Sequence, residues 1–350
     1  MNKPANDNLP ATIADEAALE ELLSRPTAEV VEVFRGLRGD VAILGAGGKI
    51  GPSLAAMACR GRGVAGTSQR IIVVSRFSNA AAREQLERLG CVTLSADLLD
   101  PAAVAALPDA ANVIYMVGQK FGTSDQPART WAINTVTPAY VARRYRGARV
   151  VAFSTGCVYD FKPAGGAGSV ETDPLTPPGE YANSCVARER VLEHFSLVDK
   201  TPMVLLRLNY AVEMRYGVLV DVASQLAAGR PIDVTMGSFN VIWQGDVNAA
   251  AWRLLDHAAS PALALNLTGA EKLSVRAVAC RLGELMGRPA AFVGQEAPTA
   301  LLSDARRAFS ILGKPPTPLD TVLRWTADWV SRGGRLLNKP THFQTRDGRY

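Results

Sequence analysis

Short, wholly apolar runs alternate with segments of helical periodicity along the chain. The apolar runs predict buried strands at 41–44, 70–75, 91–95, 112–117, 149–153 and 263–268. Helices are expected between these strands, for example at 80–89 and 101–107. Because buried strands that alternate with helices pair in the same direction, the pattern predicts an α/β fold around a parallel sheet.

Two further helices are predicted before the first strand, at 15–23 and 27–37. The pattern does not decide whether they cover an edge of the sheet or contact another subunit. The expected N-terminal caps of three helices are Thr27, Asp100 and Ser274. From Arg332 onward the chain is basic and polar, and we expect it to be extended or disordered unless an oligomer orders it.

Three glycines at intervals of three residues follow the first predicted strand, and good helix formers come next. Gly45 permits the tight turn out of the strand, and Gly51 lets the helix pack closely on it. Gly48 would let a pyrophosphate approach the backbone beside the helix N-terminus. The order strand, glycine turn, helix predicts dinucleotide binding; the alternative is a glycine-rich turn that binds nothing.

The composition is that of an ordinary globular protein, with 48% hydrophobic and 20% charged residues. The formal charge of +5 is modest, and basic residues are interspersed with acidic ones, so nucleic-acid binding is not expected. No segment has the length and apolarity of a membrane span. The three histidines show no metal-ligand spacing, so no metal is expected. Five cysteines without a CxxC pair predict reduced thiols in a cytoplasmic protein.

Ligands of an open parallel sheet bind at the carboxyl ends of its strands, so the residues after each strand carry the candidate chemistry. Arg76 follows the second strand, where a guanidinium suits the 2′-phosphate of NADP. This favours NADP over NAD, unless Arg76 is a surface residue without a ligand. Asp97 either binds the adenine amino group or caps a neighbouring helix. Lys120 lies near the cofactor ribose or the substrate, or is an exposed loop lysine.

Two hydroxyl-bearing segments are candidates for proton transfer. Residues 154–160 form a polar cluster after the fifth strand, and their hydroxyls can bond a carbonyl or carbinol oxygen. Tyr181 opens a long helix, and its phenol can act as general acid or base if a nearby cation lowers its pKa. The Gly-, Ala- and Pro-rich stretch 165–178 is expected to be either a mobile lid over the substrate or a plain surface connection.

At these residues the chain resembles the extended short-chain dehydrogenase/reductase superfamily, the NAD(P)-dependent sugar epimerases and dehydratases. The resemblance covers roughly residues 40–330. It implies a Rossmann-type doubly wound parallel sheet with a smaller C-terminal α/β substrate lobe. The implied regions are an N-terminal helical extension (1–39), the dinucleotide-binding domain (40–210 and 241–261), the substrate-binding lobe (211–240 and 262–335) and a polar tail (336–350).

Within this resemblance Thr155 falls on the catalytic Ser/Thr position and Tyr181 on the tyrosine of the YxxxK motif. The predicted cofactor-binding residues are Gly45, Gly48, Lys49, Ile50, Gly51, Arg76, Asp97, Leu98, Val117 and Asn209. The motif lysine, which binds the nicotinamide ribose and lowers the tyrosine pKa, is replaced by Cys185. Because a thiol is shorter and usually neutral, it does not supply that charge.

The missing lysine leaves three interpretations open. Another cation serves, with Lys120 as the first candidate and Lys162 and Arg188 as further ones. Alternatively, Tyr181 acts only as an acid or hydrogen-bond donor, or the protein is a non-catalytic NADP-binding sensor or regulatory protein. We favour an NAD(P)-dependent oxidoreductase or epimerase acting on a sugar or sugar-derived hydroxyl or carbonyl, with Thr155 and Tyr181 at the reacting oxygen. A cytoplasmic homodimer with a small-molecule substrate and no nucleic-acid or membrane partner is expected.

Overall fold

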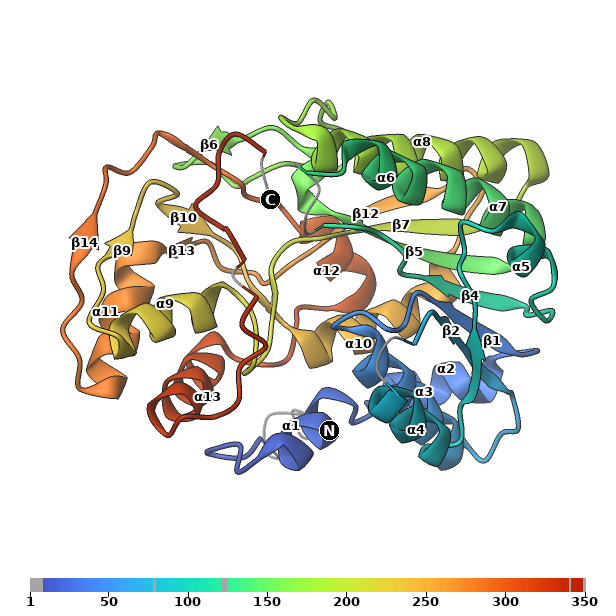
Figure 1. The fold of residues 1–350 in the computed structure, drawn as a ribbon, viewed down its shortest axis with the longest axis horizontal. Coiled ribbons are helices and arrows are strands. Elements are labelled where there is room, and N and C mark those ends of the chain that lie inside the picture. Colours follow the sequence, from blue (N-terminus) through green and yellow to red (C-terminus); the bar gives the residue numbers. More distant parts are fainter. Residues whose placement is uncertain (1–8, 78–79, 121–124, 340, 349–350) are drawn as a thin grey trace.

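The computed structural model describes residues 9–77, 80–120, 125–339 and 341–348. Its centre is a seven-stranded sheet in which all neighbouring strands are parallel (Figure 1). In sheet order the strands are β12 (Leu263–Leu267), β7 (Met203–Leu208), β5 (Arg149–Thr155), β4 (Asn112–Tyr115), β1 (Val41–Leu44), β2 (Ile71–Ser75) and β3 (Val92–Ser95). The chain winds outward from β1 on one side and from β4 on the other, which confirms the predicted doubly wound sheet.

Helices cover both faces of this sheet (Figure 1). One layer contains α2 (Ala28–Gly36), α3 (Gly51–Ala65), α4 (Ala80–Arg88) and α10 (Gln244–Arg253). The other contains α5 (Pro101–Ala105), α6 (Pro127–Trp131), α7 (Thr137–Arg144) and α8 (Glu180–Asp199). In β1, Ile43 packs with the first layer, whereas Ala42 and Leu44 pack with the second. Burial on both faces is the reason that the strands read as continuous apolar runs.

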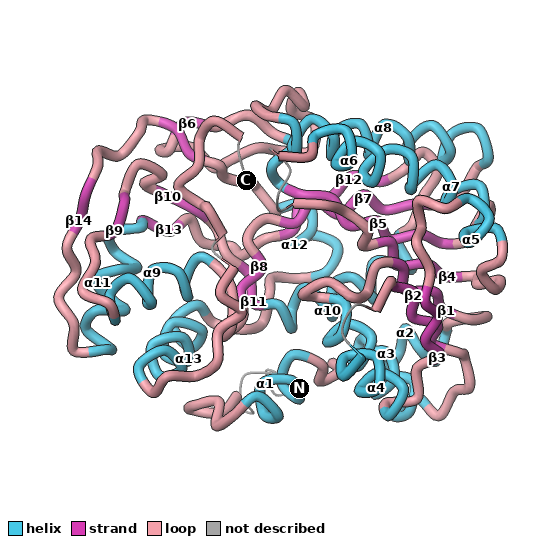
Figure 2. The backbone as a smooth tube through the Cα atoms, viewed as in Figure 1, coloured by secondary structure: helices cyan, strands magenta, loops and turns pink. Residues whose placement is uncertain are grey.

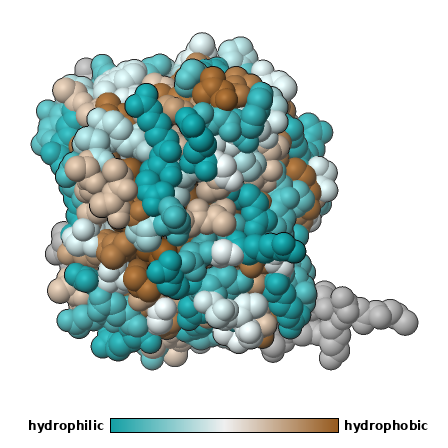
Figure 3. All heavy atoms as spheres, turned by 90° about the vertical axis from the view of Figure 1, so that its right-hand side faces the viewer, coloured by the Kyte–Doolittle hydropathy of each residue, from teal (hydrophilic) through white to brown (hydrophobic). Residues whose placement is uncertain are grey.

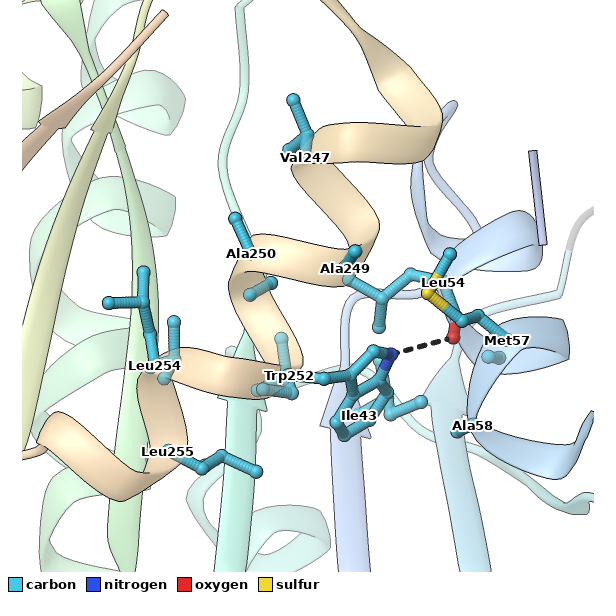
Figure 4. Close-up of a cluster of buried hydrophobic side chains, with 14 of the residues drawn as sticks. Ile43, Leu54, Met57, Ala58, Val247, Ala249, Ala250, Trp252, Leu254 and Leu255 are labelled. Atoms are coloured by element: carbon cyan, nitrogen blue, oxygen red, sulfur yellow. Dashed lines mark hydrogen bonds between the residues drawn. The ribbon is translucent and has the colours of Figure 1, made fainter. Parts of the chain in front are cut away.

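Trp252 of α10 anchors the first layer. Its indole is fully buried beside Ile43 and Leu54, and its Nε1–H donates to the carbonyl oxygen of Leu54 at 3.2 Å (Figure 4). The ring of Phe34 lies with its centroid 5.3 Å away. A large aromatic ring with a satisfied polar atom fixes α10 on α3, the helix that follows the glycine turn.

A second, smaller lobe has its own hydrophobic core. Its helices are α9 (Val218–Ala227), α11 (Val275–Met286) and α13 (Leu319–Ser331). Short elements drawn in Figure 2 are β6 (Lys162–Pro163), β8 (Ala211–Val212), β9 (Ile232–Asp233), β10 (Ser238–Phe239), β11 (Ile242–Trp243), β13 (Leu273–Ser274), β14 (Phe292–Val293), β15 (Thr299–Ala300), α12 (Arg306–Leu312), the π-helical segment 132–136 and the 3₁₀ turns 156–158 and 254–257.

The two N-terminal helices pack on different cores. α1 (Glu16–Leu23) buries Leu19 and Leu23 in the core of the smaller lobe. α2 buries Phe34 in the core between the sheet and the layer formed by α2, α3, α4 and α10. Both helices therefore cover hydrophobic surface of their own chain, which the sequence pattern left undecided.

The stretch between Thr155 and Tyr181 is attached to the smaller lobe. β6 pairs with β15 in an antiparallel ladder, and Ser169 forms a parallel bridge with Ser303. An ion pair of 2.9 Å joins Lys162 to Asp173 within the stretch. Because the stretch shares backbone hydrogen bonds with the lobe, any movement of one involves the other.

The described part of the C-terminal segment is packed against the protein. Phe343 is buried in the core of the smaller lobe, with its ring centroid 5.9 Å from that of Phe239. The backbone N–H and the hydroxyl of Thr341 both donate to Asp221, at 2.8 and 2.6 Å. Gly348 lies against Gly179, directly before α8. Residues 341–348 form no helix or strand, but they pack on their own chain, so the alternative of a tail disordered without an oligomer does not hold for them.

Figure 3 shows the face on the right-hand side of Figure 1, which hydrophilic residues largely cover. Hydrophobic residues occur there in separate patches. Scattered apolar surface of this kind is normal for a folded chain. Within the described ranges, none of the helices has the length and apolar character needed to cross a membrane.

Candidate active site

The glycine turn joins β1 to α3, and each glycine has its own geometric reason. Gly45 has a backbone φ of +87°, which residues with a side chain rarely adopt. A Cβ on Gly51 would collide with the backbone of Ala46, so the helix packs as closely as predicted. A Cβ on Gly48 would meet nothing nearer than 3.7 Å. Gly48 thus leaves room for a phosphate group at the start of α3.

The side chains of Lys49 and Ile50 point to different parts of the molecule. Ile50 packs on the core between the sheet and the helix layer that contains α3 and α10. The Lys49 ammonium donates to the carbonyl oxygen of Ala211 at 3.3 Å and lies 3.6 Å from the ring centroid of Tyr216. Burial lowers the pKa of Lys49 to about 7, although the carboxylate of Glu213 opposes this shift. Lys49 therefore links the glycine turn to the smaller lobe.

The ends of β2 and β3 carry the predicted nucleotide contacts. Arg76 is exposed, and Ser75 lies directly against Gly47 of the glycine turn. The Asp97 carboxylate accepts from the N–H of Leu99 at 3.0 Å and so caps its own turn. Leu98 is buried in the core between the sheet and the helix layer that contains α5, α7 and α8. Asp97 is exposed, and its contact with adenine stays a prediction.

Val117 and Asn209 come from the ends of β4 and β7. A Cβ on Gly45 would lie 2.9 Å from the Val117 nitrogen, so the glycine turn touches the end of β4. Asn209 is buried and lies against Gly156, and its Nδ2 has no hydrogen-bond partner among the residues that the structure describes. A buried amide without a partner is costly unless a ligand completes it. Together with the space at Gly48, it fits a dinucleotide bound along this edge.

Tyr181 lies in the first turn of α8 and is only 8% exposed. It packs with Cys157 and with Cys185, which is fully buried one helical turn away. Burial, followed by the Cys185 and Cys157 thiols, raises the pKa of Tyr181 well above its usual value, whereas the charge of Arg188 opposes the shift. Burial also raises the pKa of Cys185. Both groups are therefore neutral near pH 7 in the cofactor-free protein.

Thr155 ends β5 and caps the following 3₁₀ turn. Its Oγ1 accepts from the backbone N–H of Cys157 at 3.1 Å. Because the oxygen is used as an acceptor, the hydroxyl hydrogen can be donated to a substrate oxygen. Cys157 also belongs to the same hydrophobic cluster as Tyr181, so it connects the segment of Thr155 to that of Tyr181.

A buried polar network holds α8 on the sheet. Glu189 of α8 and Arg207 of β7 form an ion pair of 2.7 Å with almost no exposure. Glu189 also accepts from the hydroxyl of Ser154 in β5. Arg207 donates to the Tyr159 hydroxyl at 2.7 Å. These charge-assisted bonds join the carboxyl ends of β5 and β7 to the helix that carries Tyr181.

Sequence reasoning gave Asn134 and Ser184 no role, yet both belong to this region. Asn134 lies in the π-helical segment and donates to the Ser184 hydroxyl at 2.8 Å. Its oxygen accepts from the N–H of Gln119 at 3.3 Å, and Ser184 donates to the Tyr181 carbonyl oxygen at 2.7 Å. Such π segments often mark functional sites. The local signal for this irregular segment in the sequence is Asn134 itself, because asparagine is unfavourable in the interior of a helix.

The three cations considered as replacements for the motif lysine occupy different places. Lys120 lies on the side of the smaller lobe, where its charge lowers the pKa of Lys49 and opposes the raised pKa of Asp221. Lys162 is paired with Asp173, as described above. Arg188 is the one whose charge acts on Tyr181. The described residues contain no cluster of three or more His, Cys, Asp or Glu side chains that could hold a metal ion.

Residues 41–266 match the sequence profile of the NAD dependent epimerase/dehydratase family. The chain belongs to this family. Membership confirms the predicted resemblance and an enzyme of the epimerase/dehydratase type, and it supports a nicotinamide dinucleotide as the cofactor. No curated protein matches the chain in sequence.

Solved structures of sugar epimerases share the fold. UDP-glucose 4-epimerase of Thermotoga maritima has a TM-score of 0.68 and 17% identity over 84% of this chain and 99% of its own. UDP-glucuronic acid 4-epimerase of Bacillus cereus, solved with NAD, has a TM-score of 0.70 and 15% identity with the same coverage. UDP-glucose 4-epimerase of Thermus thermophilus, in complex with NAD, has a TM-score of 0.68 and 20% identity, again over 84% and 99%.

Proposed function

We propose that the protein is an NAD(P)-dependent epimerase or oxidoreductase that acts on a hydroxyl or carbonyl of a sugar or sugar derivative. The observation that carries the proposal is that Cys157, whose backbone N–H bonds Thr155, shares a hydrophobic cluster with Tyr181, in a chain of the NAD dependent epimerase/dehydratase family. Structures of the same fold include epimerases solved with UDP-sugars, which supports this substrate class.

The two hydroxyls have complementary tasks in this proposal. A nicotinamide held along the glycine turn would supply the acceptor, and then the donor, for the hydride of the carbinol carbon. Thr155 donates a hydrogen bond to the reacting oxygen, and Tyr181 exchanges the proton of that oxygen. Because the pKa of Tyr181 is raised even with the charge of Arg188 opposing the shift, Tyr181 holds its proton near pH 7 in the cofactor-free protein.

The test compares the wild-type protein with Tyr181→Phe, using a nicotinamide cofactor and a panel of sugars, sugar acids and UDP-sugars. The wild type is expected to convert at least one of them. Tyr181→Phe removes the transferable proton, so turnover should fall by about 10²-fold or more. Tyr140→Phe, a change on the helix α7, is the matched control and should retain full turnover. Equal rates in wild type and Tyr181→Phe would contradict the role of Tyr181.

A second candidate function is a nicotinamide-binding sensor or regulatory protein. The neutral Cys185 beside a Tyr181 of raised pKa favours it, because a phenol that keeps its proton is a weak base. The same panel separates the two functions. A protein that binds the cofactor with ordinary affinity but converts no sugar is the sensor.

We propose NADP as the preferred cofactor because Arg76 is exposed at the end of β2, beside the glycine turn. Arg76→Ala should weaken NADP binding by about tenfold, the loss of one charge-assisted contact, and leave NAD binding nearly unchanged. Arg88→Ala, an exposed change on α4, is the control. Calorimetric titration with both cofactors measures the ratio. A preference for NAD in the wild type would refute this assignment.

The cytoplasmic location and the homodimer remain proposals. The location rests on cysteine usage, since all five thiols are free. Lys120 and the remaining predicted cofactor contacts are proposed on their positions at the carboxyl edge of the sheet.

A further inference from the structure

Arg188 is a buried cation without an ion pair among the described residues. It is only 5% exposed, and its Nε has no hydrogen-bond partner in the described part of the chain. Its Nη1 donates to the carbonyl oxygen of Val117 at 3.3 Å. The neighbouring carboxylate, Glu189, is already engaged with Arg207 at 2.7 Å. Burying a charge without an ion pair destabilises the folded protein, so the presence of Arg188 at this place calls for a function.

The surroundings of Arg188 consist of weakly acidic groups. It lies seven residues after Tyr181 and three after Cys185, which places all three on one side of α8. The charge of Arg188 acts on both of these groups and on Tyr115 of β4. The Tyr115 hydroxyl is buried and has no hydrogen-bond partner within the described ranges. Cys157 belongs to the same hydrophobic cluster as Tyr181, and Tyr210 packs against that cluster.

The end of β4 makes room for the guanidinium. A Cβ on Gly118 would lie 2.7 Å from Nη1 of Arg188, so the guanidinium lies directly against this glycine. The guanidinium therefore occupies the junction between the end of β4, which touches the glycine turn, and the helix that carries Tyr181. A purely structural tie to Val117 would need a donor at this place, but it would not need a permanent charge.

We propose that Arg188 replaces, from farther along α8, the positive charge that Cys185 does not provide, and thereby stabilises the phenolate of Tyr181. Arg188 is a positioning residue that acts on Tyr181 through its charge. Because guanidinium keeps its proton throughout the working pH range, this charge is constant. The proposal rests on the proposed function, in which Tyr181 exchanges a proton.

The direct test titrates the phenol at position 181 in the cofactor-free protein. A fluorinated tyrosine, which is more acidic than tyrosine, is placed at position 181, and its fluorine resonance is followed against pH. Arg188→Gln keeps a donor for Val117 and removes the charge. It should raise the titration midpoint by about 1–3 pH units, the range for an opposite charge close to an acid. Arg190→Met, an exposed change on the same helix, should leave the midpoint unchanged.

Two further variants keep the test decisive. If Arg188→Gln does not fold, Arg188→Met fills the space without a polar group and carries the same expectation. Adding Cys185→Lys to either variant restores a charge beside Tyr181 and should lower the midpoint again. A midpoint that stays at the wild-type value in a folded Arg188→Gln or Arg188→Met protein overturns the proposal. Since no substrate is present, a protein without epimerase activity would still give this readout.

Discussion

Lys49 shows how one side chain can serve two parts of the site. It belongs to the glycine turn, yet its ammonium contacts Ala211 and Tyr216 of the smaller lobe. Burial lowers the pKa of Lys49 to about 7, so near neutral pH the cofactor-free protein contains both protonation states. An anionic pyrophosphate at the turn would favour the protonated amine.

Cofactor binding should therefore take up a proton. The sign follows from the two pKa values: at about pH 8, Lys49 is mostly neutral in the free protein and protonated beside a phosphate. Affinity should then fall as the pH rises above about 7. Calorimetric binding heats in buffers of different ionisation enthalpy measure the uptake. Lys49→Met should abolish it, whereas the exposed Lys314→Met should not. Heats that do not depend on the buffer in the wild type would contradict this role.

Residue by residue, the sequence predicted what depends on local chemistry. Gly45 and Gly51 were predicted because a tight strand-to-helix turn requires them wherever it occurs, and the structure gives both the expected geometry. The surroundings of Tyr181 were predicted less well. The sequence named Lys120 before Arg188, because contact between α8 and the end of β4 depends on tertiary packing that spacing does not reveal.

At the scale of elements too, features that depend on neighbouring residues were predicted, whereas features that depend on tertiary packing were not. Thr27, Asp100 and Ser274 cap their helices as predicted, since a cap is a contact between residues two or three apart. The π-helical segment 132–136 and the packed C-terminal segment were not predicted. Their geometry depends on partners far away in sequence, such as Ser184 and Asp221.

The C-terminal segment should contribute to stability through one side chain. Phe343 is 3% exposed in the core of the smaller lobe, so Phe343→Ala should lower the free energy of unfolding by about 3 kcal/mol. Chemical denaturation measures the change. Gln344→Ala, the neighbouring and less buried side chain, is the control and should stay within about 0.5 kcal/mol of the wild type. Equal stabilities of Phe343→Ala and wild type would show that the segment does not pack in solution.

At the scale of the whole molecule, the two lobes are joined at several places. α10 returns from the smaller lobe and is fixed on α3 by Trp252. Lys49 bridges from the glycine turn, and the C-terminal segment runs from Asp221 to the start of α8 (Figure 1). Movement of one lobe against the other would therefore change the surroundings of Tyr181.

The central claim is that a hydride moves between a sugar and a nicotinamide in this protein, despite Cys185 in place of the motif lysine. The most direct measurement adds UDP-sugars and free sugars to the cofactor-loaded wild type and follows the absorbance of the reduced nicotinamide together with the products. We expect reduced cofactor to form with at least one sugar and an epimer or oxidised sugar to accumulate. Cofactor that binds but is never reduced, with every sugar recovered unchanged, would contradict the claim.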